Sequence, residues 1–146
     1  MGSNKETERI ALVLRVSGRT LQLYDGSVFE ASVASRALKP IVGDRVCVDS
    51  SDKSGLVRSL AERRNCLTRT FGTLDKEIVA NLDRLFLVSA QGALFNTTVI
   101  DRVLSIAWCE SIPVTLILNK SDLGSEGLFQ IYRKLTTDTL RLSANF

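Results

Sequence analysis

The sequence predicts a protein with two structural parts, an all-β part followed by an α/β part. Short runs of alternating polarity, separated by Gly, Asp and Ser turns, fill residues 9–61. From about residue 84, continuous apolar runs alternate with stretches of helical periodicity. The charge changes along the chain as well: residues 1–80 hold thirteen Lys/Arg against ten Asp/Glu, whereas residues 81–146 hold six of each. The two halves therefore predict different kinds of fold.

Five short strands are expected in residues 9–61, after a polar tail at residues 1–8. They are Ile10–Val16, Leu21–Tyr24, Val28–Val33, Val46–Val48 and Leu56–Leu60. Ser17-Gly18-Arg19 is a turn signal that joins the first two strands as a hairpin, and Gly43-Asp44-Arg45 opens the fourth. Five short strands in about fifty residues are typical of a small closed barrel of the oligonucleotide-binding (OB) type. A fold alone does not assign a function.

Residues 81–146 predict the order β-α-β-α-β. Strands are expected at Leu85–Val88, Pro113–Leu118 and Thr139–Leu142, with helices after Asn96 and across Leu128–Leu135. The first strand is apolar throughout, as expected of a strand that is covered on both faces. Asn96 is a good helix cap, and the residues that recur at helical spacing after it are Val99, Ile100, Val103, Leu104, Ala107 and Trp108. This spacing predicts that Trp108 faces the core; the alternative is that it serves as a platform for a ligand. This order implies parallel strands with ligand-binding loops at their C-terminal ends.

Asn119-Lys120-Ser121-Asp122 directly follows the second of these strands and has the pattern of a guanine reader. The Asp122 carboxylate can accept hydrogen bonds from N1–H and N2–H₂ of guanine, whereas adenine has no such pair of donors. The Asn119 amide can donate to guanine N7, and the methylenes of Lys120 can lie over the base. The motif predicts a base site for GTP or GDP.

Ser143-Ala144 follows the third strand and supplies a second part of this site. The backbone N–H of Ala144 can donate to guanine O6, because a small side chain leaves room for the base. A Ser-Ala pair by itself carries little information. It gains meaning because it stands at the end of the strand that follows the guanine motif.

The groups that would hold the phosphates are not found in this sequence. No glycine is followed by lysine, so there is no Gly-x-x-x-x-Gly-Lys-Ser/Thr loop, and the phosphate and Mg²⁺ ligands of that loop are missing. Asp52-Lys53-Ser54-Gly55 matches a switch motif formally, but a turn between two strands explains it. No catalytic residue is assigned.

Composition excludes several other site classes. The chain has three scattered cysteines and no histidine, which argues against a metal site, a disulfide framework and a Ser-His or Cys-His nucleophile. Cys47, Cys66 and Cys109 are expected to be buried, reduced thiols in a cytoplasmic protein. No apolar run approaches the roughly 20 residues of a membrane span.

Residues 62–80 are expected to form a basic linker between the two parts. The candidate RNA contacts in the first half are Arg36, Lys39, Arg45, Arg63, Arg64 and Arg69. Phosphate contacts cannot be told from ordinary surface arginines in a sequence, so a solvated surface is the open alternative.

From about Ile10 to Ala144 the chain resembles the RsgA family of circularly permuted GTPases. The resemblance is carried by the motifs Gly43-Asp44-Arg45-Val46, Glu62-Arg63-Arg64-Asn65, Leu67-Thr68-Arg69, Ala80-Asn81-Leu82-Asp83, Val88-Ser89-Ala90, Ile100-Asp101-Arg102, Asn119-Lys120-Ser121-Asp122-Leu123 and Ser143-Ala144. What distinguishes this family is the position of the guanine motif, after an OB-like barrel and before any phosphate loop.

The resemblance implies a GTP hydrolase that acts in maturation of the small (30S) ribosomal subunit. It implies an OB barrel that contacts rRNA, a permuted P-loop GTPase domain that uses GTP with Mg²⁺, and a C-terminal zinc domain. We expect residues 81–146 to be the base-reading half of that GTPase domain, and the chain to be a monomeric fragment that is inactive alone. The alternative is a non-enzymatic RNA-binding OB protein with a degenerate α/β scaffold.

Overall fold

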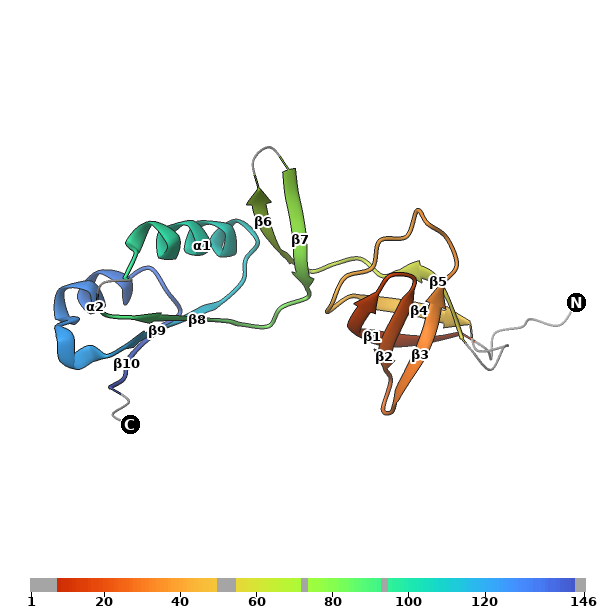
Figure 1. The fold of residues 1–146 in the computed structure, drawn as a ribbon, viewed down its shortest axis with the longest axis horizontal. Helices are drawn as coiled ribbons and strands as arrows, with labels where there is room; N and C mark the ends of the chain where they lie inside the picture. Colours follow the sequence, from red (N-terminus) through yellow and green to blue (C-terminus); the bar gives the residue numbers. More distant parts are fainter. Residues whose placement is uncertain (1–7, 50–54, 72–73, 93–94, 144–146) are drawn as a thin grey trace, which may run out of the picture. The chain divides into compact units, whose positions relative to one another are not determined.

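The structure is a computed structural model that describes residues 8–49, 55–71, 74–92 and 95–143 (Figure 1). The chain divides into two compact units, Met1–Asn81 and Leu82–Phe146. Each unit is described by itself.

Five strands of the first unit close into a barrel in the order β1-β2-β3-β5-β4. They are β1 (Glu8–Ser17), β2 (Thr20–Tyr24), β3 (Val28–Val33), β4 (Arg45–Asp49) and β5 (Leu56–Leu60). β1 pairs antiparallel with both β2 and β4, and β3 pairs parallel with β5. Each of the five strands predicted from the alternating pattern lies in one of these strands.

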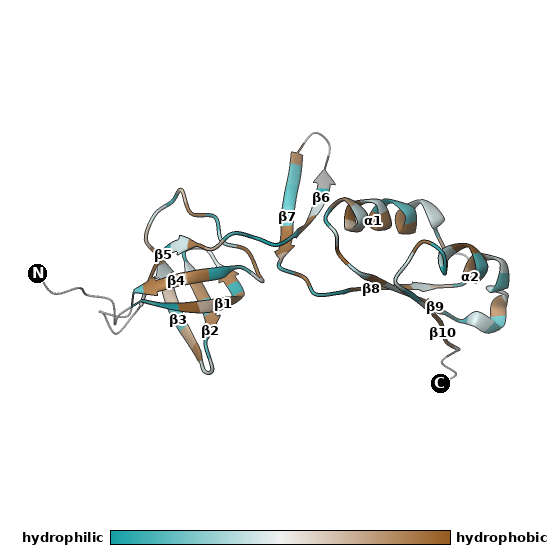
Figure 2. Cartoon of the chain, turned by 180° about the vertical axis from the view of Figure 1, so that it is seen from behind, coloured by the Kyte–Doolittle hydropathy of each residue, from teal (hydrophilic) through white to brown (hydrophobic). Residues whose placement is uncertain are grey.

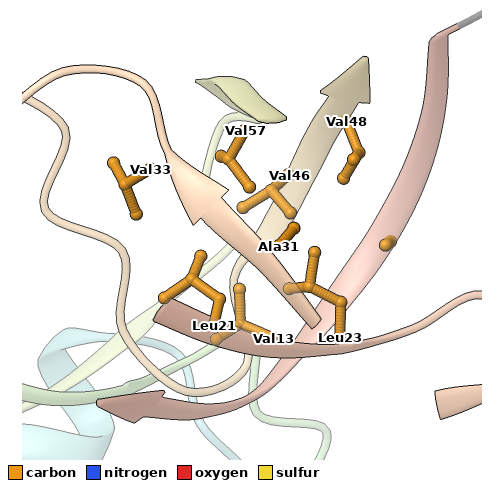
Figure 3. Close-up of a cluster of buried hydrophobic side chains, with 9 residues drawn as sticks. Val13, Leu21, Leu23, Ala31, Val33, Val46, Val48 and Val57 are labelled. Carbon is orange, nitrogen blue, oxygen red and sulfur yellow. The ribbon is translucent and has the colours of Figure 1, made fainter. Parts of the chain in front are cut away.

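Alternate residues of the five strands fill the inside of the barrel. The buried cluster consists of Ala11, Val13, Leu21, Leu23, Ala31, Val33, Val46, Val48 and Val57 (Figure 3). Side chains on a strand point to opposite faces in turn, so a period of two places every second residue in this core. Most of the cluster is valine, leucine or alanine, which fits a barrel of small diameter.

Residues 62–80, expected to be a linker, contain a β-hairpin. β6 (Cys66–Phe71) pairs antiparallel with β7 (Leu74–Ala80) as a separate two-stranded sheet. The hairpin joins the barrel through a parallel bridge between Val42 and Val79. The charged residues of β7, Asp75, Lys76 and Glu77, are exposed, whereas Ala80 at its end is buried.

The second unit contains a three-stranded parallel sheet in the order β10-β9-β8. Its elements are β8 (Leu85–Ala90), α1 (Thr97–Cys109), β9 (Val114–Asn119), the 3₁₀ turn η1 (Ser121–Leu123), α2 (Glu126–Tyr132) and β10 (Asp138–Arg141). The predicted order and parallel pairing are confirmed. α2 begins two residues before the predicted start and ends at Tyr132, where hydrogen-bonded turns follow.

Asn96 caps α1 as predicted, its side chain accepting a hydrogen bond from the backbone N–H of Val99. The prediction that Trp108 faces the core is wrong, because its side chain is 78% exposed. Ile100, Leu104 and Ala107 form the buried line of the helix. At about 100° per residue, Trp108 lies roughly 80° around the helix from Ile100 and so falls outside that line.

The prediction that β8 is covered on both faces is also wrong. Phe86 and Val88 are each 62% exposed, and Leu140 of β10 is 47% exposed. In register, Val88 stands beside Ile117 and Ile117 beside Leu140, so these residues share one face of the sheet. Both crossovers step in the same direction, from β8 to β9 to β10, which places both helices on the opposite face. Figure 2 shows the hydrophobic residues of these strands.

Within the residues described, no helix is both long and apolar enough to span a membrane.

Candidate functional site

The guanine motif lies at the C-terminal edge of the parallel sheet. Asn119 is the last residue of β9, and Asp122 lies in η1 directly after it. Ser143 follows the end of β10, and Gln91 follows the end of β8. In open parallel sheets, ligands bind in the crevice outside the carboxyl ends of the strands. The described residues thus bring three strand ends to one edge.

A tight turn presents the side chains of the motif. Lys120 has a φ of +54°, in the left-handed region that few non-glycine residues adopt, and Gly124 ends the turn with a φ of +89°. The Asn119 side-chain oxygen accepts a hydrogen bond from the backbone N–H of Lys120 at 2.8 Å. The backbone of Leu123 then donates to the Lys120 carbonyl at 3.1 Å. Asn119 is half-buried, whereas Lys120 and Asp122 are exposed to solvent.

The two predicted parts of the base site lie together. The Ser143 hydroxyl donates to the Asp122 carboxylate at 2.6 Å, although 21 positions separate the two residues. The backbone supports this contact, because Ser121 N–H donates to the Leu142 carbonyl at 3.0 Å and Leu142 N–H donates to the Leu118 carbonyl at 2.9 Å. Ala144, the remaining predicted base contact, lies outside the described residues.

The geometry of Asp122 suits it to accept from two further donors. An ionised carboxylate has two oxygens and about four acceptor positions. The bond from Ser143 uses one of them and holds the group in one orientation. The remaining positions can take the adjacent N1–H and N2–H₂ donors of guanine. Ser143 is therefore placed to orient the Asp122 carboxylate.

Arg141 fixes the start of α2 beside this edge. Its guanidinium donates to the hydroxyl of the buried Ser125 at 3.0 Å and forms an ion pair with Glu126. It also stands 5.6 Å from the centre of the Phe129 ring, within the range of a cation–π contact. These contacts join β10 to the helix that follows the motif.

Gln91 is a member of this edge that the sequence reasoning missed. Its backbone N–H donates to the Asn119 carbonyl at 3.0 Å, and the residue is only 9% exposed. Its Nε2 is the one fully buried side-chain nitrogen or oxygen that lacks a hydrogen-bond partner in the described part of the chain. A polar residue directly after the apolar strand β8 was the available signal.

Two of the six candidate RNA contacts lie together on the barrel. Arg36 and Lys39, with Arg19 from the β1–β2 turn, line a surface hollow of about 250 Å³ whose apolar lining includes Val33 and Leu38. Arg19 is fixed there by donating to the Val33 carbonyl at 2.9 Å. Arg19 was not among the predicted contacts.

The other four candidate contacts are spread over the first unit. Arg45 is an exposed residue of β4, and Arg69 is an exposed residue of β6. Arg64 is also exposed, and its side chain donates to the Asn81 carbonyl at 3.2 Å.

Arg63, the fourth of these, joins the barrel to the hairpin. Its guanidinium donates to both oxygens of Asp44, at 2.7 and 3.0 Å, and contacts the Glu77 carboxylate at 2.7 Å. Asp44 is fully buried, and Glu77 lies on β7. These two carboxylates raise the pKa of Arg63 further above its ordinary value, with the hydrogen bond to Asp44 the largest cause. The observed contacts are those of a structural residue.

Among the residues that the structure describes, no group of three or more His, Cys, Asp or Glu side chains is arranged to hold a metal ion.

Comparison with known proteins gives a family for this chain. The family model described as RsgA GTPase matches residues 60–145. The protein "Small ribosomal subunit biogenesis GTPase RsgA" from Bordetella pertussis is 30% identical over 141 residues, which cover 91% of this chain and 47% of that protein. The protein of the same name from Marinobacter nauticus is 33% identical, with 94% and 43% covered. This chain therefore spans less than half the length of these curated relatives.

A solved structure shows the same fold. The crystal structure of YjeQ from Thermotoga maritima matches with a TM-score of 0.74 at 24% identity, covering 93% of this chain and 52% of that one. The match extends over both units. On the family match and the relatives together, the chain belongs to the RsgA GTPase family.

Proposed function

We propose that the second unit recognises guanine nucleotides at the C-terminal edge of its sheet. The observation that carries this proposal is the hydrogen bond from Ser143 to Asp122, which joins the two predicted parts of the base site. Asp122 accepts from N1–H and N2–H₂ of guanine, Asn119 donates to N7, and the stem of Lys120 lies over the ring. The backbone N–H of Ala144 donates to O6.

We further propose that residues 81–146 are the base-reading half of a circularly permuted P-loop GTPase domain. The sheet order, the position of the motif after β9 and the names of the relatives support this assignment. Residues 9–61 are an OB-type barrel, supported by five short strands closed in the order β1-β2-β3-β5-β4. Residues 62–80 connect the two parts.

The whole protein, on this proposal, hydrolyses GTP with Mg²⁺ during late maturation of the small (30S) ribosomal subunit. It acts in the cytoplasm as a monomer and binds rRNA through the barrel. The basis is the similarity to relatives named as small ribosomal subunit biogenesis GTPases. The hollow with Arg19, Arg36 and Lys39 is the surface we assign to the RNA, because three cations around an apolar floor suit phosphates and bases together.

The experiment is a titration of the isotope-labelled 146-residue chain with GDP and ADP, followed by NMR. We expect GDP to shift the backbone amide signals of residues from Asn119 to Ser143. ADP at the same concentration should leave these signals unchanged. Equal shifts with both nucleotides, or none with either at millimolar GDP, would reject the guanine site.

Hydrolysis is a separate test. We propose that the 146-residue chain by itself does not turn over GTP, because the sequence has no phosphate loop to stabilise the charge of the transition state. Phosphate release from Mg-GTP should equal the protein-free blank. Phosphate release above that blank, if it disappears in the Asp122→Ala variant, would contradict the proposed absence of turnover.

A further inference from the structure

The unpartnered amide of Gln91 lies at the same sheet edge as the proposed base site. Its Nε2 is fully buried without an acceptor, and the residue as a whole is only 9% exposed. Burying an amide N–H without a partner is costly, so such groups are rare in folded proteins. A buried N–H donor without a partner, at the sheet edge where ligands bind, indicates an acceptor that is not among the described residues.

The backbone around Gln91 is tied to the guanine motif. Gln91 N–H donates to the Asn119 carbonyl, which continues the pairing of Ala90 with Asn119 at the end of the β8–β9 ladder. The next residue, Gly92, has a φ of +123°, and a Cβ at that position would lie 3.8 Å from the Leu123 side chain of η1. The turn after β8 therefore packs against the turn that carries Asp122.

The strand order indicates which part of a nucleotide Gln91 meets. Asp122 and Ser143 are held together between β9 and β10, whereas Gln91 ends β8 on the other side of β9. Neighbouring strands lie about 4.8 Å apart, so β8 and β10 are roughly 10 Å apart. This separation exceeds the width of a purine ring. If the base is held at the β9–β10 side, the sugar and phosphates meet Gln91 when they extend toward β8.

We propose that Gln91 is a nucleotide-binding residue whose Nε2 donates to an oxygen of the sugar–phosphate part of the guanine nucleotide. The inference rests on the proposed guanine site. Pairing removes the penalty of the buried donor, so the nucleotide gains affinity when the carboxamide turns toward it. Because this contact does not involve the base, Gln91 contributes to affinity and leaves base selectivity to Asp122.

The test compares Gln91→Met with the parent chain, because methionine keeps the length of the side chain and removes the donor. The ligands are GDP, guanosine and 9-methylguanine, each titrated and followed by NMR. We expect Gln91→Met to weaken GDP binding by about tenfold, in line with the loss of one charge-assisted hydrogen bond, and to leave 9-methylguanine unchanged. A loss already present with guanosine assigns the acceptor to the ribose; a loss seen only with GDP assigns it to a phosphate.

Two further variants make the result decisive. Gln91→Glu keeps the shape but places a carboxylate against the nucleotide, and it should weaken GDP binding at least as much as Gln91→Met. Gln22→Met, on the exposed face of β2, is the matched control and should change nothing.

Two results would overturn the assignment of Gln91 alone. The first is an unchanged GDP affinity in Gln91→Met. The second is an equal loss of affinity for GDP and for 9-methylguanine in that variant. Both count against Gln91 alone when a separate Asp122→Ala variant has lost GDP binding. A parent chain that binds no GDP would overturn the guanine site itself and the role of Gln91 with it.

Discussion

At the scale of single residues, Asp122 combines exposure to solvent with a fixed orientation. It stands in a turn that begins with the left-handed Lys120, and Ser143 holds one of its oxygens. A carboxylate in this setting is arranged before a ligand arrives, so less conformational freedom is lost on binding. This is the property expected of a residue that distinguishes one base from another.

Replacing Asp122 by Asn should change the preferred base. The amide keeps one oxygen acceptor for N1–H but offers an N–H₂ donor where guanine also presents a donor, and xanthine presents a carbonyl there. We expect Asp122→Asn to lose at least tenfold in affinity for GDP and to gain affinity for XDP, since an unmatched donor pair is penalised. Competition binding measures both values. The same GDP-over-XDP preference in the variant and in the parent chain would argue against base reading by Asp122.

Among the described glycines of the first unit, Gly43 leaves the least room for a side chain. Its φ is +88°, and a Cβ built there would lie 2.0 Å from the Ala80 carbonyl oxygen. Because the clash is with backbone, a change of side-chain rotamer cannot relieve it. The contact lies where the barrel meets the end of β7.

Gly43→Ala should lower the free energy of unfolding of the first unit by about 2–4 kcal/mol, from backbone strain and overpacking together. Gly18→Ala is the matched control, because Gly18 also has a positive φ of +62° but open space around its Cβ. It should cost only about 1 kcal/mol. Urea denaturation followed by circular dichroism compares the two variants. Equal costs would show that the approach of Ala80 is not what requires glycine at position 43.

At the scale of elements, the hairpin is attached to the barrel by polar contacts around one buried charge. Asp44 is fully buried and accepts from the Ile41 backbone N–H at 2.8 Å as well as from Arg63. Arg63 also contacts Glu77 on β7. The Asn81 side chain adds a bond to the Gly43 carbonyl at 2.9 Å. A two-stranded hairpin is marginal by itself, so these contacts decide whether it stays ordered.

Arg63→Leu should destabilise the first unit by about 2–4 kcal/mol, because it leaves the buried Asp44 carboxylate without its main partner. Arg58→Leu breaks an exposed ion pair with Asp49 and is the control; it should cost less than about 1 kcal/mol. Hydrogen exchange should show the largest loss of protection in β6 and β7. If the Arg63→Leu and Arg58→Leu variants are equally stable, the contact between Arg63 and Asp44 does not contribute to attaching the hairpin to the barrel.

The parallel sheet shows how elements position a site with few residues. Both crossovers step in the same direction, so both helices cover one face. The three strands are parallel, so the segments that follow them lie at one edge. This arrangement places Gln91, Asn119 and Ser143 at neighbouring strand ends. The exposure of Phe86 and Val88 on the other face has the same cause.

At the scale of the whole molecule, the excess of positive charge belongs to the first unit, whereas the second is balanced. Arg19, Arg36 and Lys39 gather around one hollow. Charge held in this way attracts phosphates and releases their counterions when RNA binds.

Binding of small-subunit rRNA fragments should therefore weaken steeply with salt. Removing all three cations in the triple variant Arg19→Ala, Arg36→Ala, Lys39→Ala should lower the slope of log affinity against log salt by about 2, at roughly 0.7 per phosphate contact. Arg133→Ala in the second unit is the control. Fluorescence anisotropy between 50 and 200 mM salt measures the slope. An affinity that does not vary with salt would exclude phosphate binding as its source.

The sequence was a good guide wherever one short stretch contains the whole signal. Short β-type runs between Gly, Asp and Ser turn signals located the five barrel strands, and Asn96 located the start of α1. It was a poor guide where the outcome depends on a distant partner. Trp108 has the hydrophobicity of a core residue, yet the direction of the helix against the sheet leaves it exposed. The hairpin at 66–80 forms against Val42 and Gly43, which no local pattern shows.

The sequence by itself determined the two-part organisation, the strand and helix order, and the Asn119–Asp122 motif, because backbone period and motif chemistry are local properties. Only the tertiary structure decided that Ser143 bonds to Asp122, that Arg63 is bound to a buried carboxylate, and that Gln91 keeps an unpaired donor at the same edge. Those facts depend on which strands are neighbours and on how deeply each side chain is buried, and both are set when the whole chain packs.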